Sequence, residues 1–438
     1  MYLYRTNFGL KIIDRASKRY AKLLNVIQYF VIVSGYLLMI IGTWYFIKFS
    51  YIYLTNTFLV EAIKVPVIFP LIPYFTDIFK IDYLPSFPFV TFIIVLILIA
   101  IPHEFAHGIF ARFYNIRVHS TGFGFLRLFK IPLPFIGAFV EPDEKQMAKR
   151  AKKEQLSVLA AGTFANLITT ILFGLIFVLF IYLFLTPAGV YFNTYSTKII
   201  PIDNVISIDG VPINEVKIEN NLEKLPLKYI QSEKENLTVQ RGITNGTNIE
   251  YFVVYENSPA FEAKLSGPIT YIDGQKITSY EILRTIIQNH EPGDNINIIT
   301  LNEKNKTRKE QIITLADNEG KAFLGIGTNF RKPSGIFRIY YSTVAKIKNP
   351  FVYYESKLGD LGMFIYYILW WILFISLGVA FFNMLPVSIL DGGRFFAITI
   401  WAITKRNKLG EYALKMSTLI FLALLAALTF RWIFAFIL

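Results

Sequence analysis

Five long apolar runs constrain this chain more than any other feature of its sequence. Each run has at least the roughly 20 residues that an α-helix needs to cross the hydrocarbon core of a bilayer. The runs are Leu24–Ile47, Phe89–Phe110, Leu156–Leu185, Leu361–Phe382 and Met416–Leu438. Hydrophobic residues make up 54% of the 438 residues, a share that excludes an ordinary soluble protein. The sequence therefore predicts a polytopic α-helical protein with several passes through the cell membrane.

Basic residues gather at the ends of these runs. The chain carries 44 Lys and Arg against 31 Asp and Glu, which gives a formal net charge of +13. Because the cations crowd into residues 1–23 and 112–155, beside predicted spans, we expect membrane lipid and no nucleic acid as their partner. By the positive-inside rule both segments face the cytoplasm. The N terminus is then cytoplasmic, and residues 187–350 lie outside the cell.

A polar domain lies between the third and fourth predicted spans. Its short alternating segments, such as NINIITL, predict β-strands. VISIDGVPI (205–213) and ITYIDGQKI (269–277) are alike, and each predicts a strand followed by an Asp-Gly turn. The second continues into the helix-like stretch SYEILRTIIQNH, an order that resembles a PDZ domain. The first then resembles a degenerate second copy, and a repeated turn within one mixed α/β domain is the alternative.

Two of the four histidines lie in an apolar run, in the sequence HEFAH. On a helix, His103 and His107 share one face because they are four residues apart. Two imidazoles so placed can bind a zinc ion, and Glu104 beside them can take a proton from the water on that ion. The chain has no cysteine, so thiolate ligands are excluded. Two hydrogen-bonded histidines are the alternative, but a helix in lipid offers them few partners.

A catalytic zinc site needs a third protein ligand. His119 lies in a loop beyond the end of the predicted helix, and His290 lies in the external domain, so we expect both to be ordinary surface histidines. Asp391, in the sequence LDGG, is the better candidate. The predicted topology places it at the inner end of the fourth span, on the same side of the bilayer as the two histidines. A turn or helix cap would by itself also explain Asp-Gly-Gly.

HEFAH and NMLPVSILDGG together resemble the site-2 protease family of intramembrane zinc metalloproteases (peptidase M50 type). The resemblance covers roughly residues 85–186 and 355–400, and it implies a three-helix zinc protease core. AAGTFANL (160–167) is similar to the Gly-Pro-x-x-Asn element of the family, although Thr163 stands in place of the usual proline. An external PDZ-like insertion is also a feature of this family.

The segment TGFGFLRLFKIPLPFIGAFVEPDE (121–144) is similar to the re-entrant β-hairpin of the family, which faces the active site. Acidic residues close this segment, and they either orient the hairpin or form a solvated cytoplasmic loop. They are Glu141, Asp143 and Glu144.

The resemblance implies one zinc ion per chain, with Glu104 as the general base and later the proton donor to the leaving amine. Asn166 and Asn383 match family positions that face the site, where they would bind the substrate backbone or stabilise the oxyanion. Simple hydrogen bonding between membrane helices is the alternative for both amides. The implied zinc ligands are His103, His107 and Asp391.

These expectations divide the chain into five parts. Residues 1–85 hold a cytoplasmic segment, the first transmembrane helix and an external loop, and residues 86–186 hold the HExxH helix, the hairpin and the middle core helix. Residues 187–335 form the PDZ-like domain outside the cell. Residues 336–404 hold the core helix with the LDG motif, and residues 405–438 form the last transmembrane helix.

The resemblance implies a zinc metalloendopeptidase that hydrolyses peptide bonds within or near transmembrane helices, as in regulated intramembrane proteolysis. The active site would lie near the cytoplasmic side. Its partners would be transmembrane-helix substrates and an upstream site-1-type protease. A prenyl-protein processing peptidase is a weaker alternative, because such enzymes take the third ligand from a glutamate on a later helix. A non-catalytic receptor or chaperone with a structural metal also stays open, although such a site has no need of Glu104.

Overall fold

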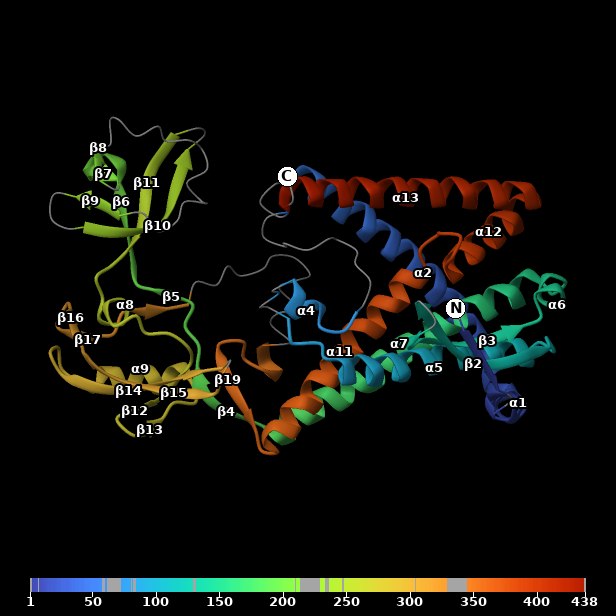
Figure 1. Cartoon of the computed structure of the whole chain (residues 1–438), viewed down its shortest axis with the longest axis horizontal. Coiled ribbons are helices and arrows are strands. Elements are labelled where there is room, and N and C mark those ends of the chain that lie inside the picture. Colours follow the sequence, from blue (N-terminus) through green and yellow to red (C-terminus); the bar gives the residue numbers. More distant parts are fainter. Residues whose placement is uncertain are drawn as a thin grey trace. The chain divides into compact units, whose positions relative to one another are not determined.

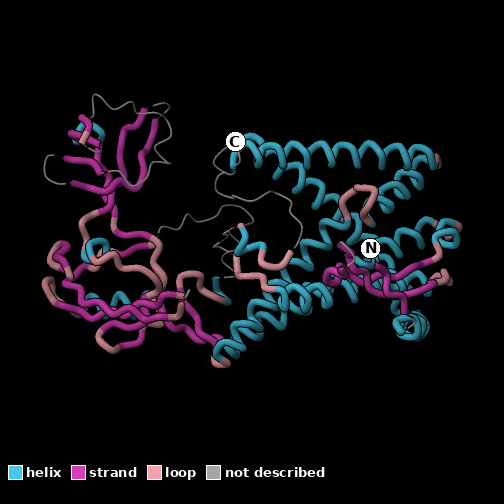
Figure 2. The backbone as a smooth tube through the Cα atoms, in the orientation of Figure 1, coloured by secondary structure: helices cyan, strands magenta, loops and turns pink. Residues whose placement is uncertain are grey.

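The chain divides into two compact units, and the computed structural model in Figure 1 and Figure 2 shows the elements of each. The first unit is Met1–Leu179 with Phe364–Leu438, and the second is Phe180–Met363. The described residues are 2–6, 8–56, 60, 72–79, 81, 84–128, 131–208, 210–212, 229–232, 236–245, 248–303, 305–328 and 345–436.

Five helices of the described chain are long and apolar enough to cross a membrane, which confirms the five predicted spans. Each helix begins before its apolar run or ends after it, because the polar residues at the run's ends continue the helix. α7, for example, begins four residues ahead of Leu156. The five are α2 (Ala21–Thr55), α5 (Phe89–Phe113), α7 (Lys152–Phe184), α11 (Gly359–Asn383) and α13 (Asn407–Phe436).

Side chains from α2, α5, α7 and α11 form the main core of the first unit. Val31, Ala111 and Ala160 are fully buried in it. A Cβ on Gly35 of α2 would lie only 2.9 Å from the Cβ of Ala160, so this glycine lets α2 approach α7 closely. Two shorter helices lie between these spans in the sequence. They are α4 (Phe75–Ile78), which precedes α5, and α12 (Asp391–Thr404), which leads into α13.

A three-stranded sheet follows the C-terminal end of α5. β2 (Val118–Leu128) and β3 (Ile131–Pro142) pair as the predicted antiparallel hairpin, with residues 129–130 outside the described chain. An unpredicted strand, β1 (Tyr2–Thr6), pairs antiparallel with the other side of β2. The order β1-β2-β3 leaves β3 at an edge, where it packs beside α5. α1 (Phe8–Arg19) follows β1, and α6 (Glu144–Ala148) follows β3.

The second unit starts from one ladder between β4 (Leu185–Val190) and β19 (Val352–Ser356). β4 continues from α7 and β19 precedes α11, so this ladder holds together the outgoing and returning segments of the chain. β4 also joins a larger sheet of order β15-β14-β12-β4-β19. Its other members are β12 (Ile269–Ile272), β13 (Gln275–Lys276), β14 (Asn295–Asn302) and β15 (Thr307–Thr314).

A second sheet of this unit has the order β6-β11-β10-β9-β7-β8. Its strands are β6 (Thr197–Pro201), β7 (Val205–Ile208), β8 (Val211–Pro212), β9 (Tyr229–Ser232), β10 (Asn236–Asn245) and β11 (Asn248–Tyr255). The remaining elements are β5 (Thr194–Tyr195), η1 (Ile202–Asn204), α8 (Pro259–Glu262), α9 (Tyr280–Gln288), β16 (Ala316–Asn318), β17 (Lys321–Phe323) and β18 (Ile326–Gly327).

The strand predicted at NINIITL and the helix predicted after ITYIDGQKI are confirmed as β14 and α9. The turn between β12 and β13 has positive φ at both Asp273 (48°) and Gly274 (76°), as a two-residue hairpin turn of type I′ requires. Asp209, in the corresponding turn of the first copy, lies outside the described residues. The two alike segments belong to different sheets, and the PDZ assignment stays a prediction.

Candidate metal centre

His103 and His107 lie on the buried face of α5, as their spacing predicts. They are 6% and 9% exposed, respectively. The helix forms because its residues are almost all apolar, and Pro102 is tolerated inside it. Gly108, the next residue, lets α1 pack closely, since a Cβ there would lie 2.7 Å from Ile13. The helix that carries the two imidazoles is therefore packed against α1.

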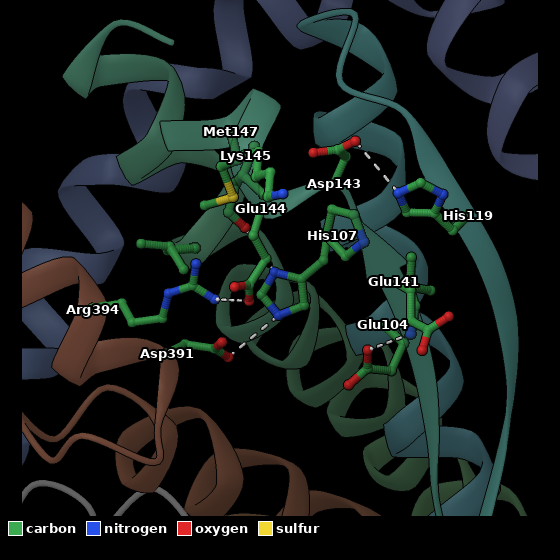
Figure 3. Close-up of a pocket in the computed structure, with 14 residues that line it drawn as sticks. Glu104, His107, His119, Glu141, Asp143, Glu144, Lys145, Met147, Asp391 and Arg394 are labelled. Atoms are coloured by element: carbon green, nitrogen blue, oxygen red, sulfur yellow. Dashed lines mark hydrogen bonds and ion pairs between the residues drawn. The ribbon is translucent and has the colours of Figure 1, made fainter. Parts of the chain in front are cut away.

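Asp391 joins the two histidines at the first residue of α12. Its Oδ2 lies 3.4 Å from His103 Nε2 and 3.3 Å from His107 Nε2, and the two Nε2 atoms are 3.2 Å apart. Figure 3 shows the Asp391 carboxylate facing the imidazole of His107, with a dashed line between them. Four tetrahedral ligands bonded to zinc at about 2.0–2.2 Å would be separated by about 3.3–3.6 Å. The triangle in this chain has the edges that such an ion needs, and the donor set fits zinc.

In both histidines Nδ1 has a hydrogen-bond partner behind the ring, and this contact orients the ring so that Nε2 points toward Asp391. His107 Nδ1–H donates to the carbonyl oxygen of Val158 over 2.7 Å. Because a carbonyl can only accept, the proton sits on Nδ1 and the lone pair of Nε2 is left for a metal. Metal-binding histidines usually have such a partner behind the ring.

Asn166 of α7 is the corresponding partner of the other histidine. Its side-chain amide lies 3.0 Å from His103 Nδ1, and its oxygen Oδ1 is buried with no hydrogen-bond partner among the described residues. An amide turned by 180° places the oxygen against Nδ1–H, which satisfies both groups. Asn166 is 0% exposed, so the structure brings it to a histidine and not to an open surface.

Gly162 leaves the space in which an ion would fit. A Cβ at this position would lie 2.3 Å from His107 Nε2 and 2.6 Å from His103 Nε2. Gly162 is the glycine of the AAGTFANL segment on α7. Any other residue there would push side-chain atoms into the imidazoles.

The residues around Asp391 fix its place through backbone packing. A Cβ on Gly392 would lie 2.3 Å from the backbone of Met384, and one on Gly393 would lie 2.1 Å from the carbonyl oxygen of Val387. The two glycines therefore let the start of α12 pack against the preceding loop. Asn383, at the end of α11, reaches the same site with its amide nitrogen 3.4 Å from His103 Nε2.

Glu104 lies beside the triangle and bonds to the edge strand of the sheet. Its Oε2 accepts a hydrogen bond from the backbone N–H of Val140 in β3, over 3.1 Å. Its side chain lines a cavity of about 830 Å³ together with His107 and Asp391 (Figure 3). The Glu104 carboxylate and two of the proposed ligands therefore line one cavity that is large enough to admit water.

Charged pairs form the rim of this cavity. His119 contacts Asp143 at 3.4 Å, and Arg394 contacts Glu144 at 3.1 Å (Figure 3). His119 thus lines the cavity, but it lies outside the group of three close ligand atoms. His290 pairs with Asp273 in the second unit.

Arg5 of β1 contacts a residue that lines the cavity, and nothing in the sequence indicated this contact. Its guanidinium donates to Glu141 at 2.9 Å, and Ser120 donates to the same carboxylate at 2.5 Å. The hydrogen bond from Arg5, followed by that from Ser120, lowers the pKa of the Glu141 carboxyl from its ordinary value. Glu141 follows Val140 directly, so the pair ties the strand that holds Glu104 to the N-terminal strand.

Comparison with known proteins adds two findings. The family model described as peptidase family M50 matches residues 91–428, a range that contains HEFAH, AAGTFANL and LDGG. An uncharacterized protein of Methanocaldococcus jannaschii is 37% identical over 171 residues, which are 38% of this chain. The match covers 40% of the length of that relative.

Proposed function

The chain belongs to peptidase family M50, and from this premise we propose that it is an intramembrane-cleaving zinc metalloendopeptidase. Family membership makes it a membrane metalloprotease, and its five apolar helices make it a multi-pass membrane protein. The observation that carries the finer proposal is the triangle of His103, His107 and Asp391, with edges of 3.2–3.4 Å. A prenyl-protein peptidase would take its third ligand from a glutamate, whereas the third group here is Asp391. A receptor with a structural metal would use the same triangle, and Glu104 beside it favours the peptidase because a structural site has no need of that carboxylate.

His103, His107 and Asp391 would hold one zinc ion, which when bound polarises a scissile carbonyl and makes water a stronger nucleophile. Glu104 acts as the base. Its Oε2 is engaged by the N–H of Val140, and Oε1 takes the proton of the attacking water. The same carboxyl then delivers that proton to the leaving amine nitrogen as the peptide bond breaks.

The two asparagines take different roles in this proposal. Asn166 holds the ring of His103, because its amide is fully buried behind that ring. Asn383 approaches His103 from the end of α11 and is partly exposed, so its amide N–H can donate to the substrate carbonyl as negative charge develops there.

No strand of the described chain pairs with the outer edge of β3, so an unwound substrate segment can add there as a further strand. The N–H of Val140 points away from β2, toward Glu104, and by the alternation of a strand the N–H of Ala138 points the same way. Ala138→Pro should therefore lower substrate crosslinking and cleavage about tenfold, while Ala138→Ser leaves both unchanged. Unaltered crosslinking in proline variants along 122–140 would contradict edge pairing.

The substrates we propose are transmembrane proteins whose external parts another, site-1-type protease has removed. The domain at 187–335 would act as the filter for such trimmed substrates. Basic residues at the start of α2 and between α5 and α7 support a cytoplasmic N terminus, with the active site near the cytoplasmic side and the domain outside.

Zinc content tests the ligand set. Purified wild type should hold about one zinc per chain, and Asp391→Ala should lose it or bind it far more weakly. Glu144→Gln is the matched control, because it removes a carboxylate of the same cavity that lies outside the triangle. Zinc that is indifferent to Asp391 would refute the site.

Glu104→Gln separates chemistry from metal binding. The variant should keep its zinc and cleave a single-span substrate about 10²–10⁴ times more slowly, the usual contribution of a general base. A biological phenotype that survives this change would favour the receptor.

A further inference from the structure

The outer face of α1 carries a row of cations. Positions 11, 15 and 19 follow one another at intervals of four, so they project from one side of this helix. All of these side chains are exposed. The row consists of Lys11, Arg15 and Arg19, with Lys18 beside it, and Lys22 follows at the start of α2.

No carboxylate in the described part of the chain neutralises this row. Asp14 is the acidic residue of α1, and it is engaged by Arg112 of α5 at 2.8 Å. Between the cations lies a shallow hollow of about 400 Å³, open to the outside. Its lining is Lys11, Ile12, Arg15, Ala16, Arg19 and Tyr20. Arg19 lies over the ring of Tyr20, 5.6 Å from its centroid, and the face therefore offers positive charge without a carboxylate partner among the described residues, around a space that a small anionic group can enter.

The position of α1 in the chain brings this face to the membrane surface. α1 ends at Arg19, and the membrane-crossing helix α2 begins at Ala21. The first exposed apolar side chain of α2 is Leu23, so α1 lies within about one helical turn of the hydrocarbon. Lipid headgroups occupy this level of a bilayer, and clusters of four or more basic residues beside a span attract anionic ones.

The opposite face of α1 packs against the helix that carries HEFAH. Ile13 is fully buried against Gly108, which directly follows His107. Gly9 contacts Phe105, which directly follows Glu104, and a Cβ at Gly9 would lie 3.1 Å from that ring. A ligand on the outer face is thus one helix away from the proposed zinc ligands.

We propose that the outer face of α1 is a docking site for the anionic headgroups of the leaflet in which α2 begins. The lipids hold α1 in place, and α1 in turn holds the HEFAH segment of α5. The proposal does not depend on proteolysis, because headgroup binding is a property of the face itself.

Lipid selectivity of the full chain in bilayers tests the proposal. The protein is placed in phosphatidylcholine vesicles with one fifth phosphatidylglycerol, and association of spin-labelled lipids of both kinds is compared. Lys11→Gln, Arg15→Gln, Lys18→Gln and Arg19→Gln together should lower the preference for phosphatidylglycerol at least about fivefold, which is the effect of a single cation near an anionic surface.

Two variants with the same number of changes serve as controls. Exchanging Lys and Arg at the four positions keeps the charge and should keep the preference. Removing four exposed cations of the second unit should leave it unchanged; these are Lys276, Arg284, Lys309 and Lys321. Equal preference in the α1 variant and the wild type would overturn the proposal. So would loss of the preference to millimolar inorganic phosphate at matched ionic strength, which would identify a free-phosphate site.

Discussion

Gly162 determines at the residue scale whether two imidazoles and an ion can share one space. Gly162→Ala places a methyl group 2.3 Å from His107 Nε2, so the rings must move apart. We expect zinc binding to weaken at least tenfold, with cleavage lost in proportion, as measured by metal analysis at increasing chelator concentration.

Gly174→Ala is the matched control for this change. It alters the same helix, but its Cβ would meet a single atom of Leu373 at an ordinary 3.5 Å. Full zinc content in Gly162→Ala would show that the rings do not converge as described.

Asn166 should act through His103. Asn166→Leu removes the acceptor behind Nδ1 and should weaken zinc binding about 10–100-fold, the usual cost of losing such a partner. Asn166→Asp keeps an oxygen there and should retain most of the affinity. A residue that contacts only the substrate would instead raise KM with unchanged zinc affinity.

The sequence predicted which residues are the proposed ligands, but it did not predict the contacts that hold them in position. His103, Glu104 and His107 form a local pattern that a helix brings to one face, so their proximity follows from spacing alone. Asp391 was predicted as the third ligand from the LDGG motif, the predicted topology and the family resemblance. The contact of Asn166 with a histidine could not be read from the sequence, because it depends on how α5 and α7 pack.

At the scale of elements, β1 secures the hairpin through Arg5. Because Arg5 lowers the pKa of Glu141, their interaction stabilises the fold above the ordinary glutamate pKa of about 4.3 and is lost as the pH falls through the lowered value. Arg5→Ala should lower Tm only slightly at pH 7, by about 1–2 °C, and the difference should become smaller as the pH falls toward 3.

Arg117→Ala, an exposed arginine just before β2, is the control and should have little effect at either pH. A Tm difference for Arg5→Ala that persists unchanged at pH 3 would mean that ion pairing is not the cause.

Elements that carry a local pattern were predictable, and β1 and α12 were not. The five spans follow from apolar runs, and the hairpin follows from strand-forming residues on either side of a turn. β1 has only five residues, and its partner β2 begins more than 100 residues later. Nothing local in the first six residues specifies that pairing. α12 was missed because it is short and joins two spans.

At the scale of the whole molecule, the β4–β19 ladder allows the second unit to be removed cleanly. Val190 pairs with Val352, and the N–H of Tyr191 donates to Phe351 at 2.8 Å, so these ends already adjoin. Replacing residues 192–350 by a short Gly-Ser turn should leave about one zinc per chain. Cleavage of a substrate without an external domain should change less than about threefold, while discrimination against bulky substrates is lost.

Zinc loss in this shortened chain would show that the first unit does not hold the site by itself. Unchanged discrimination against bulky substrates would refute the filter proposed for the second unit. Zinc content and a competition assay with two substrates give these answers separately.

The distance in sequence between the proposed ligands has a consequence for biosynthesis. Asp391 follows His107 by 284 residues, so the histidines leave the ribosome long before their third partner exists. At about 5–20 residues per second, that interval lasts roughly 15 to 60 s. Under the proposed function, a site completed earlier would meet membrane-spanning substrates during this interval. Dividing the proposed ligands between two helices that are far apart in the sequence would therefore delay this activity until nearly the whole chain has been made.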